Sequence, residues 1–219
     1  MNLYLVRHGQ SQGNVTPGCG GDDPTLTELG FEQARQVGLR LANVKFDCII
    51  ASPLRRALAT ANEIAIRQPE GPMSVELLPD VMVCGPSPEF VPKAYGELLE
   101  ICPTALPYTV PTAAGGGESL PEEYHDLHMY LARCHRIVSY LRRRFPGEEN
   151  VALVAHGVFI SRMVVAALRF PYPDHFNFQH DNTAVTKISY INMEDHVHTR
   201  LCFLNDTSHL YHAGLSKGV

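Results

Sequence analysis

The 219-residue sequence contains no long apolar run and no excess of positive charge. A membrane-spanning helix needs about 20 consecutive apolar residues, and no stretch of the chain approaches that length. Lysine and arginine together number 18 against 23 aspartates and glutamates, which gives a formal net charge of -5. This balance argues against binding to nucleic acid or to an anionic membrane surface. If the substrate is anionic, positive charge must be gathered locally.

The chain also lacks the signals of an oxidising compartment. Its first residues have neither the basic lead-in nor the longer apolar stretch of a signal peptide. Its six cysteines include no Cys-x-x-Cys pair, and we expect them to be free thiols in a cytoplasmic protein. The eleven histidines are not accompanied by acids or cysteines in a recognisable ligand pattern. We therefore expect no metal site and no cofactor.

The size and the pattern of the chain are those of one α/β domain over residues 1–219. A chain of this length buries about 70% of the surface that it exposes when unfolded, so it needs no disulfide or metal to fold. Short apolar runs alternate with amphipathic stretches, which is typical of parallel strands connected by helices. We expect a three-layer αβα sandwich with a central, mostly parallel sheet.

The expected strands are apolar runs bounded by glycine, proline or polar residues, and the expected helices carry apolar residues at helical spacing. The strands are predicted at residues 2–6, 46–51, 73–78, 151–155, 182–192 and 196–204. The helices are predicted at about 27–43, 54–66, 89–101, 120–145 and 158–168. Residues 79–121 are interpreted as a lid-like insertion over the active edge of the sheet. The tail from Asn205 is expected to be loosely held.

Three of the predicted strands are followed by histidine or arginine. Arg7-His8 follows the first strand, Arg55-Arg56 follows the second, and His156-Gly157 follows the strand at 151–155. In open α/β sheets the carboxyl ends of the strands meet at one edge, where ligands bind. These residues would form a cationic pocket suited to phosphoryl chemistry. Arginine matches phosphate oxygens, one imidazole can attack phosphorus, and a protonated imidazole can stabilise the charge.

Four motifs occur in order at these strand and helix ends: Leu5-Val6-Arg7-His8-Gly9-Gln10-Ser11, Leu26-Thr27-Glu28-Leu29-Gly30, Ser52-Pro53-Leu54-Arg55-Arg56-Ala57 and Val154-Ala155-His156-Gly157. Together they resemble the motifs of the histidine phosphatase superfamily, in the branch that contains cofactor-dependent phosphoglycerate mutase. Two later stretches, at residues 116–119 and 182–183, also resemble landmarks of that family. The resemblance covers most of the chain, from residue 3 to about residue 191.

The resemblance implies a role for each matching residue. His8 corresponds to the nucleophile that becomes phosphohistidine, and Arg7 to the arginine beside it that grips the phosphoryl group. His156 corresponds to the second active-site histidine. The further phosphate contacts that the resemblance implies are Asn14 and the amide of Gly157.

The second phosphate arginine has two neighbouring candidates. The family pattern is Arg-Ala followed by Thr-Ala, and Arg56 matches it because Ala57, Thr60 and Ala61 follow at the right spacing. Arg55 is therefore expected to be a solvated residue at the start of a helix.

One position departs from the family pattern. The glutamate that the family places after the third strand, as general acid for the leaving group, aligns with Val83, which has no proton to donate. Asp80, Glu89 and Glu118 are alternative acids. General acid help is typically worth about 10²–10⁴ in rate, so substrates with good leaving groups should suffer least.

The expected activity is hydrolysis of a phosphomonoester through phosphohistidine at His8, with a small phosphorylated metabolite or phosphate as partner. A phosphoglycerate-type mutase is a second possibility, disfavoured because residues 79–117 lack the glutamate and arginine-rich substrate contacts of the mutase branch. A phosphate-binding regulatory protein with little turnover is a third, because of Val83. The sequence leaves the substrate and the oligomeric state open.

Overall fold

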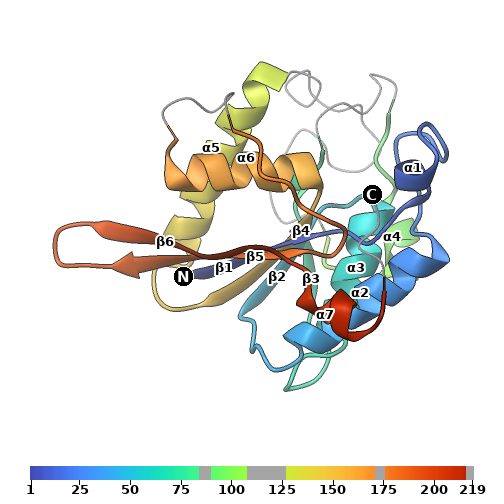
Figure 1. Ribbon diagram of the computed structural model, residues 1–219, viewed down its shortest axis with the longest axis horizontal. Coiled ribbons are helices and arrows are strands. Elements are labelled where there is room, and N and C mark those ends of the chain that lie inside the picture. The colour runs from blue at the N-terminus through green and yellow to red at the C-terminus, as the bar shows by residue number, and fades with distance from the viewer. Residues whose placement is uncertain (84–89, 108–126, 171–175, 216–219) are drawn as a thin grey trace.

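The structure is a computed structural model and describes residues 1–83, 90–107, 127–170 and 176–215 (Figure 1). Its centre is a six-stranded sheet with the strand order β3-β2-β4-β1-β5-β6. The strands are β1 (Asn2–Arg7), β2 (Cys48–Ala51), β3 (Val75–Leu77), β4 (Asn150–Ala155), β5 (Val185–Asn192) and β6 (Val197–Asp206). β1 to β4 pair in parallel, β5 is antiparallel to β1, and β6 is antiparallel to β5.

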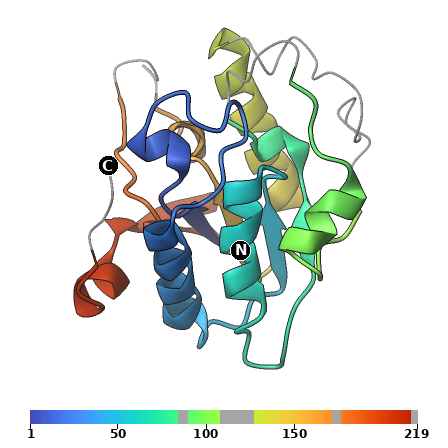
Figure 2. The same cartoon turned by 90° about the vertical axis from the view of Figure 1, so that its right-hand side faces the viewer.

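Helices cover both faces of this sheet. On one face α2 (Glu28–Leu41) and α3 (Arg55–Ala65) lie side by side, as Figure 2 shows. On the other face lie α5 (Leu127–Arg144) and α6 (Gly157–Leu168) (Figure 1). The shorter helices are α1 (Gln12–Val15), the 3-10 turn η1 (Pro79–Val81), α4 (Tyr95–Ile101) and α7 (Ser208–His212). The predicted three-layer α/β fold with a mostly parallel sheet is confirmed.

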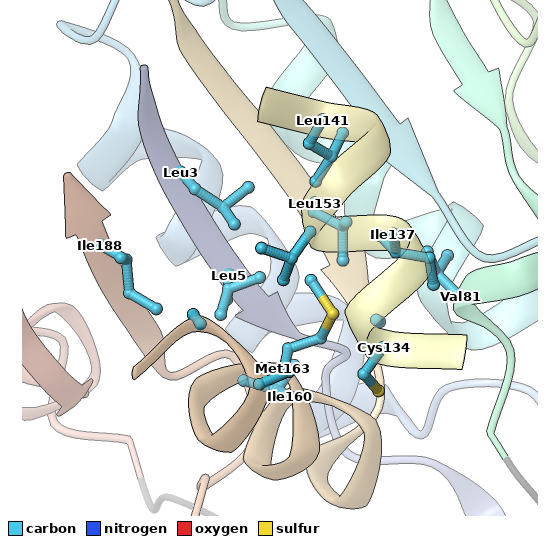
Figure 3. Close-up of a cluster of buried hydrophobic side chains, with 14 of the residues drawn as sticks. Leu3, Leu5, Val81, Cys134, Ile137, Leu141, Leu153, Ile160, Met163 and Ile188 are labelled. Carbon is cyan, nitrogen blue, oxygen red and sulfur yellow. The ribbon is translucent and has the colours of Figure 1, made fainter. Parts of the chain in front are cut away.

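The two helical layers explain why the central strands are apolar without interruption. In β1, Leu3 and Leu5 belong to the core beneath α5 and α6, whereas Tyr4 and Val6 belong to the core beneath α2 and α3. Figure 3 shows the first of these cores, in which Leu3 and Leu5 lie near Met163 of α6. A strand covered on both faces alternates between two apolar layers, so its sequence shows no polar alternation. Each fully buried aliphatic side chain contributes about 1.5–3 kcal/mol to folding.

The chain after Asn205 was expected to be loosely held, and this is wrong as far as residue 215. β6 continues to Asp206, whose carboxylate pairs with Arg40 of α2. The short helix α7 then buries Leu210 and His209. Isolated contacts such as these anchor the segment, and they form no pattern that a short stretch of sequence would reveal.

The region predicted as an insertion is only partly described. The helix predicted at 89–101 begins at Tyr95, and residues 90–94 are not helical, in keeping with Pro92 disfavouring helix for the residue before it. Leu98 and Cys102 are fully buried in the core beneath α3. Residues 84–89 and 108–126 lie outside the described part, as does the predicted start of the helix at 120–145. A lid over the active edge therefore stays a prediction.

Two further observations concern the described residues as a group. None of their helices is long and apolar enough to cross a membrane. The five cysteines in the described part of the chain, at positions 19, 48, 102, 134 and 202, are free thiols.

Candidate active site

The register of the sheet places two histidines next to each other. β1 pairs with β4 so that Arg7 lies opposite Ala155. The residues that follow these two in the sequence are His8 and His156. Their ring centroids lie 5.2 Å apart, with the ring planes at 60°. Both side chains are buried, with exposed fractions of 4% and 2%. The pair is therefore a direct consequence of how the two strands align.

A cavity of about 480 Å³ opens at this edge of the sheet. The loop that follows α1, Val83, the start of α6 and residues 177–180 contribute to its wall. All six residues predicted for the site line it: Arg7, His8, Asn14, Arg56, His156 and Gly157. The structure thus brings together residues from three separate motifs, as the sheet topology predicts.

His8 is held in the form that a nucleophile requires. Its Nδ1 lies 2.7 Å from the carbonyl oxygen of Gly9, and a carbonyl can only accept, so Nδ1 carries the proton. The lone pair of the neutral ring is then on Nε2. Burial lowers the pKa of His8 well below its usual value, and the charges of Arg56 and Arg7 lower it further. His8 is neutral at pH 7, and its Nε2 is able to attack phosphorus.

Two arginines supply the positive charge of the cavity. Arg7, at the end of β1, donates from Nη1 to the carbonyl oxygen of His180 at 2.6 Å. Arg56 lies in the first turn of α3, with Nη1 at 3.7 Å from Oδ1 of Asp23. Burial lowers the pKa of Arg7, and it lowers that of Arg56 to about 10. Both guanidinium groups therefore stay charged at neutral pH.

His156 differs from His8 in its partners. It caps the start of α6, and its Nε2 lies 2.9 Å from Oγ of Ser52. Burial, and then the charges of Arg56 and the neighbouring His8, lower its pKa well below the usual value. A bound dianion would oppose this effect, since it favours the protonated ring. The charge of His156 is therefore expected to depend on whether the cavity holds an anion.

Three buried polar atoms of the cavity have no hydrogen-bond partner among the described residues. They are Nε of Arg7, Nη1 of Arg56 and Nδ1 of His156. Buried polar groups in folded proteins nearly always have a partner, so such a cluster needs an explanation. The starts of α3 and α6 add positive potential on the same side. Each of these nitrogen atoms can donate to an oxyanion, and a cavity with this lining suits phosphate.

The other two predicted contacts, Asn14 and Gly157, line the same cavity. Oδ1 of Asn14 accepts from the amide and the hydroxyl of Ser11, both at 3.0 Å, which leaves its NH₂ group as the donor for a ligand. At Gly157 a Cβ atom would lie 3.3 Å from Nε of Arg7, closer than most side chains tolerate. Glycine at this position therefore leaves room for the guanidinium group.

Several positioning residues were not predicted. Thr60 accepts from the amide of Gly9 at 3.1 Å and donates to the carbonyl oxygen of Arg56 at 2.8 Å. It connects the loop that carries His8 to α3, which carries Arg56. Asn182 donates to the carbonyl oxygen of His8 at 3.1 Å. Thr60 and Asn182 lie in or beside the motifs quoted above. Their place in those motifs was the only sign in the sequence that they contact the site.

Arg55 was expected to be solvated, and this is wrong. Its Nε donates to the carbonyl oxygen of Asp23 at 3.0 Å and lies 3.3 Å from the carboxylate, and its side chain is only 31% exposed. Asp23 also faces Arg56, so it connects the two arginines. Burial raises the pKa of this aspartate, although the amide of Arg55 and the two guanidinium groups act against it. Adjacency in the sequence gave no indication of this arrangement.

Val83 occupies the place in the cavity wall where an acid was expected from the family pattern. A side chain of α5 holds the backbone next to Val83, because Arg133 donates from Nη2 to the carbonyl oxygen of Met82 at 2.9 Å. Val83 also packs against the small apolar cluster of Leu54 and Met82. The side chain at this position is thus held at the cavity but provides only apolar surface.

The three alternative acids are not found at the cavity in the described structure. Asp80 lies in a separate hollow beside α5, lined also by His135 and Arg136. Glu89 and Glu118 lie outside the described residues. Within the described wall, Asp22 is the only carboxylate. In the same part of the chain no three histidine, cysteine, aspartate or glutamate side chains gather closely enough to hold a metal ion.

A sequence profile of the histidine phosphatase superfamily, branch 1, matches residues 3–82 and 107–201. The chain belongs to this superfamily. Its members are phosphatases and mutases that act through a phosphohistidine, in agreement with the environment of His8.

Relatives of both kinds resemble this member of the superfamily. The adenosylcobalamin/alpha-ribazole phosphatase of Escherichia coli (strain K12) is 26% identical over 185 residues, covering 83% of this chain and 86% of the relative. The 2,3-bisphosphoglycerate-dependent phosphoglycerate mutase of Brucella melitensis is 32% identical over 206 residues, covering 89% and 94%. The superfamily is therefore shown, whereas the choice between hydrolase and mutase depends on the site.

Solved structures share the fold. A phosphoserine phosphatase from Entamoeba histolytica, in complex with phosphoserine, superposes with a TM-score of 0.65 at 24% identity, covering 95% of this chain and 98% of that one. A mycobacterial glucosyl-3-phosphoglycerate phosphatase gives a TM-score of 0.64 at 24% identity, covering 94% and 99%. At these identities the likeness concerns the fold alone.

Proposed function

We propose that the protein is a phosphomonoester hydrolase that acts through a covalent phosphohistidine at His8, on a small phosphorylated metabolite. One observation carries the proposal. A buried, neutral His8 shares a cavity with three polar atoms that have no hydrogen-bond partner among the described residues, contributed by Arg7, Arg56 and His156. The arrangement provides a nucleophile and the donors for one tetrahedral anion.

The reaction has two steps. Nε2 of His8 attacks phosphorus, and the bond between phosphorus and the ester oxygen breaks while Arg7 and Arg56 hold the equatorial oxygens. The ester oxygen leaves with the bonding electron pair and takes a proton from solvent water, while His156 stabilises the charge of the transferring group. A water molecule then attacks phosphorus and gives up a proton to the solvent, the bond to His8 breaks, and phosphate leaves. His8 returns to its neutral form.

The leaving alcohol has no acid at the position of Val83. Because general acid help is typically worth about 10²–10⁴ in rate, esters of acidic alcohols are expected to react fastest. A nitrophenyl ester needs little protonation of its leaving group and is therefore a suitable first substrate.

The test is hydrolysis of p-nitrophenyl phosphate by the wild type and by His8→Ala. We expect His8→Ala to lower kcat by at least about 10³-fold, as removal of a nucleophile does. The exposed His196, paired with Asp195, offers a matched control, and His196→Ala should leave the rate unchanged. A phosphoryl label that is stable to alkali, labile to acid and absent from His8→Ala would identify the intermediate. Full activity of His8→Ala would refute the proposal.

A mutase is the second candidate, because the phosphoglycerate mutase of Brucella melitensis is 32% identical. Conversion of 3-phosphoglycerate to 2-phosphoglycerate, dependent on a bisphosphate primer and faster than release of phosphate, would favour it. A third outcome, binding of phosphate without turnover of any ester, would favour a regulatory protein. The nitrophenyl assay and ³¹P NMR of the phosphoglycerate reaction distinguish all three.

A further inference from the structure

The fixed positive charge of the cavity is confined to its phosphate end. Arg7 and Arg56 are the only arginines or lysines in the described wall, and both act on the same His8. Six other basic side chains in the described part are paired with acids: Arg35, Arg40, Lys45, Arg67, Lys93 and Arg144. Within the described wall, no further arginine or lysine is therefore offered to a substrate bound through its phosphate.

Beyond Arg7 and Arg56 the described wall contains no arginine or lysine, and it combines uncharged polar side chains such as Asn177 and Gln179 with apolar ones. Val83, Val158 and Phe178 provide apolar surface, and Val158 is 54% exposed, at the start of α6. Asp22 adds the only carboxylate of that wall. The glycine-rich loop carries it there, because Gly21 has a φ of +62°, a conformation that favours glycine. This part of the wall is what the alcohol portion of a phosphomonoester would meet.

We propose that the enzyme selects phosphomonoesters whose alcohol portion carries no negative charge, and that Asp22 and the apolar wall make this selection. The inference rests on the proposed function, because it assumes that the phosphate lies against His8. A carboxylate or a second phosphate on the alcohol portion would lose its hydration without gaining a cation. It would also be repelled by Asp22. An uncharged alcohol incurs neither cost, and its carbon atoms can contact the valines and Phe178.

Glycerol 3-phosphate and 3-phosphoglycerate form a matched pair for the test. They differ in one group, a hydroxymethyl in the first and a carboxylate in the second. Binding is measured by calorimetry on His8→Ala, so that turnover plays no part. We expect this variant to bind 3-phosphoglycerate at least about tenfold more weakly than it binds glycerol 3-phosphate. In the wild type, kcat/KM for release of phosphate should favour glycerol 3-phosphate by a similar factor.

Two variants test the origin of the selection. Asp22→Asn, in the His8→Ala background, should reduce the ratio of the two dissociation constants by about three- to tenfold. Val158→Lys should reduce it as well, because it places a cation at an exposed point of the wall. Asp195→Asn removes an exposed carboxylate at the far turn between β5 and β6 and should leave the ratio unchanged.

The outcomes separate this inference from the proposed function. Equal binding of the two esters, or a ratio that Asp22→Asn does not change, would overturn the selection. A fall in kcat for both esters alike in Asp22→Asn would also overturn it, since Asp22 would then act in the chemistry. Absence of nitrophenyl phosphate hydrolysis by the wild type would refute the hydrolase, and the calorimetric ratio would still be measured.

Discussion

Arg55 and Arg56 are neighbours in the chain but contribute to different parts of the surface. Arg56 lines the cavity with the two histidines, whereas Arg55 lines a separate hollow with Lys93 and Glu97. Asp23 contacts both guanidinium groups. Arg56 can therefore bind phosphate directly, and Arg55 can act only by holding Asp23 in place.

This difference gives a prediction about inhibition by phosphate. Charged hydrogen bonds are worth about 1.5–3 kcal/mol, so Arg56→Ala should raise the inhibition constant of phosphate by about 10- to 100-fold. Arg55→Ala should raise it by no more than a few-fold. The constants are measured against p-nitrophenyl phosphate. Equal effects would mean that the assignment of the phosphate arginine is wrong.

The four central residues of the site could be predicted because each stands at a strand end or a helix start. Parallel pairing then brings His8 and His156 together, as their ring distance shows. Asp23 and Thr60 could not be predicted in the same way. They act through backbone carbonyl and amide groups of distant residues, and the type of these residues does not reveal such contacts, although Thr60 stands within a quoted motif.

At the scale of elements, the loop of the nucleophile rests on the first turn of α2. A Cβ atom at Gly30 would lie 1.9 Å from the carbonyl oxygen of Gln10, and one at Gly9 would lie 2.4 Å from that of Gly30. Thr27 caps α2 by accepting from the amide of Gly30 at 3.0 Å, and it donates to Oε1 of Gln10 at 2.9 Å. The position of His8 thus depends on a contact between backbones.

Gly30→Ala should test this contact. The added methyl group must displace the backbone of Gln10, so we expect a loss of about 2–4 kcal/mol in the free energy of unfolding and a lower kcat. Gly96, an exposed residue of α4, is the control, because a Cβ atom there meets no other atom within 4 Å. Gly96→Ala should be neutral or stabilise by up to about 1 kcal/mol. Urea unfolding measures both, and equal effects would contradict the argument.

The elements themselves were predictable to different degrees. β1 and β4 stand out because both of their faces are buried, and an uninterrupted apolar run is the result. α7 did not stand out, because a helix of five residues that buries Leu210 shows no periodicity. The start of α4 was placed too early for a related reason, since its first turn is set by the chain around Pro92 rather than by an apolar stripe.

At the scale of the whole molecule, four buried histidines resist protonation. Burial lowers the pKa of His180 and His209 to about 4, and it lowers those of His8 and His156 well below the usual value. An unfolded histidine has a pKa of about 6.5. Between these values the unfolded chain binds protons that the native chain does not, so stability falls as the pH falls.

We therefore expect acid to destabilise the protein from about pH 6.5 downward. His180 and His209 should each cost roughly 3 kcal/mol by pH 4, while the raised pKa of Asp23 acts in the opposite direction. The urea midpoint should fall between pH 7 and pH 5. On the proposed function phosphate binds the native state, so adding phosphate should move the midpoint back. A midpoint that is constant over this range would disagree with the burial of these rings.

The pairing of β1 with β4 separates the part of the site that holds the histidines from the part that would meet the alcohol. The spacing of the two imidazoles is set by six consecutive pairs of strand residues in the middle of the sheet. The surface that would meet the alcohol comes instead from segments after α1, η1 and α6. Substitutions in those segments can therefore change which alcohol fits the cavity without altering the strand pairing that sets the distance between the two imidazoles.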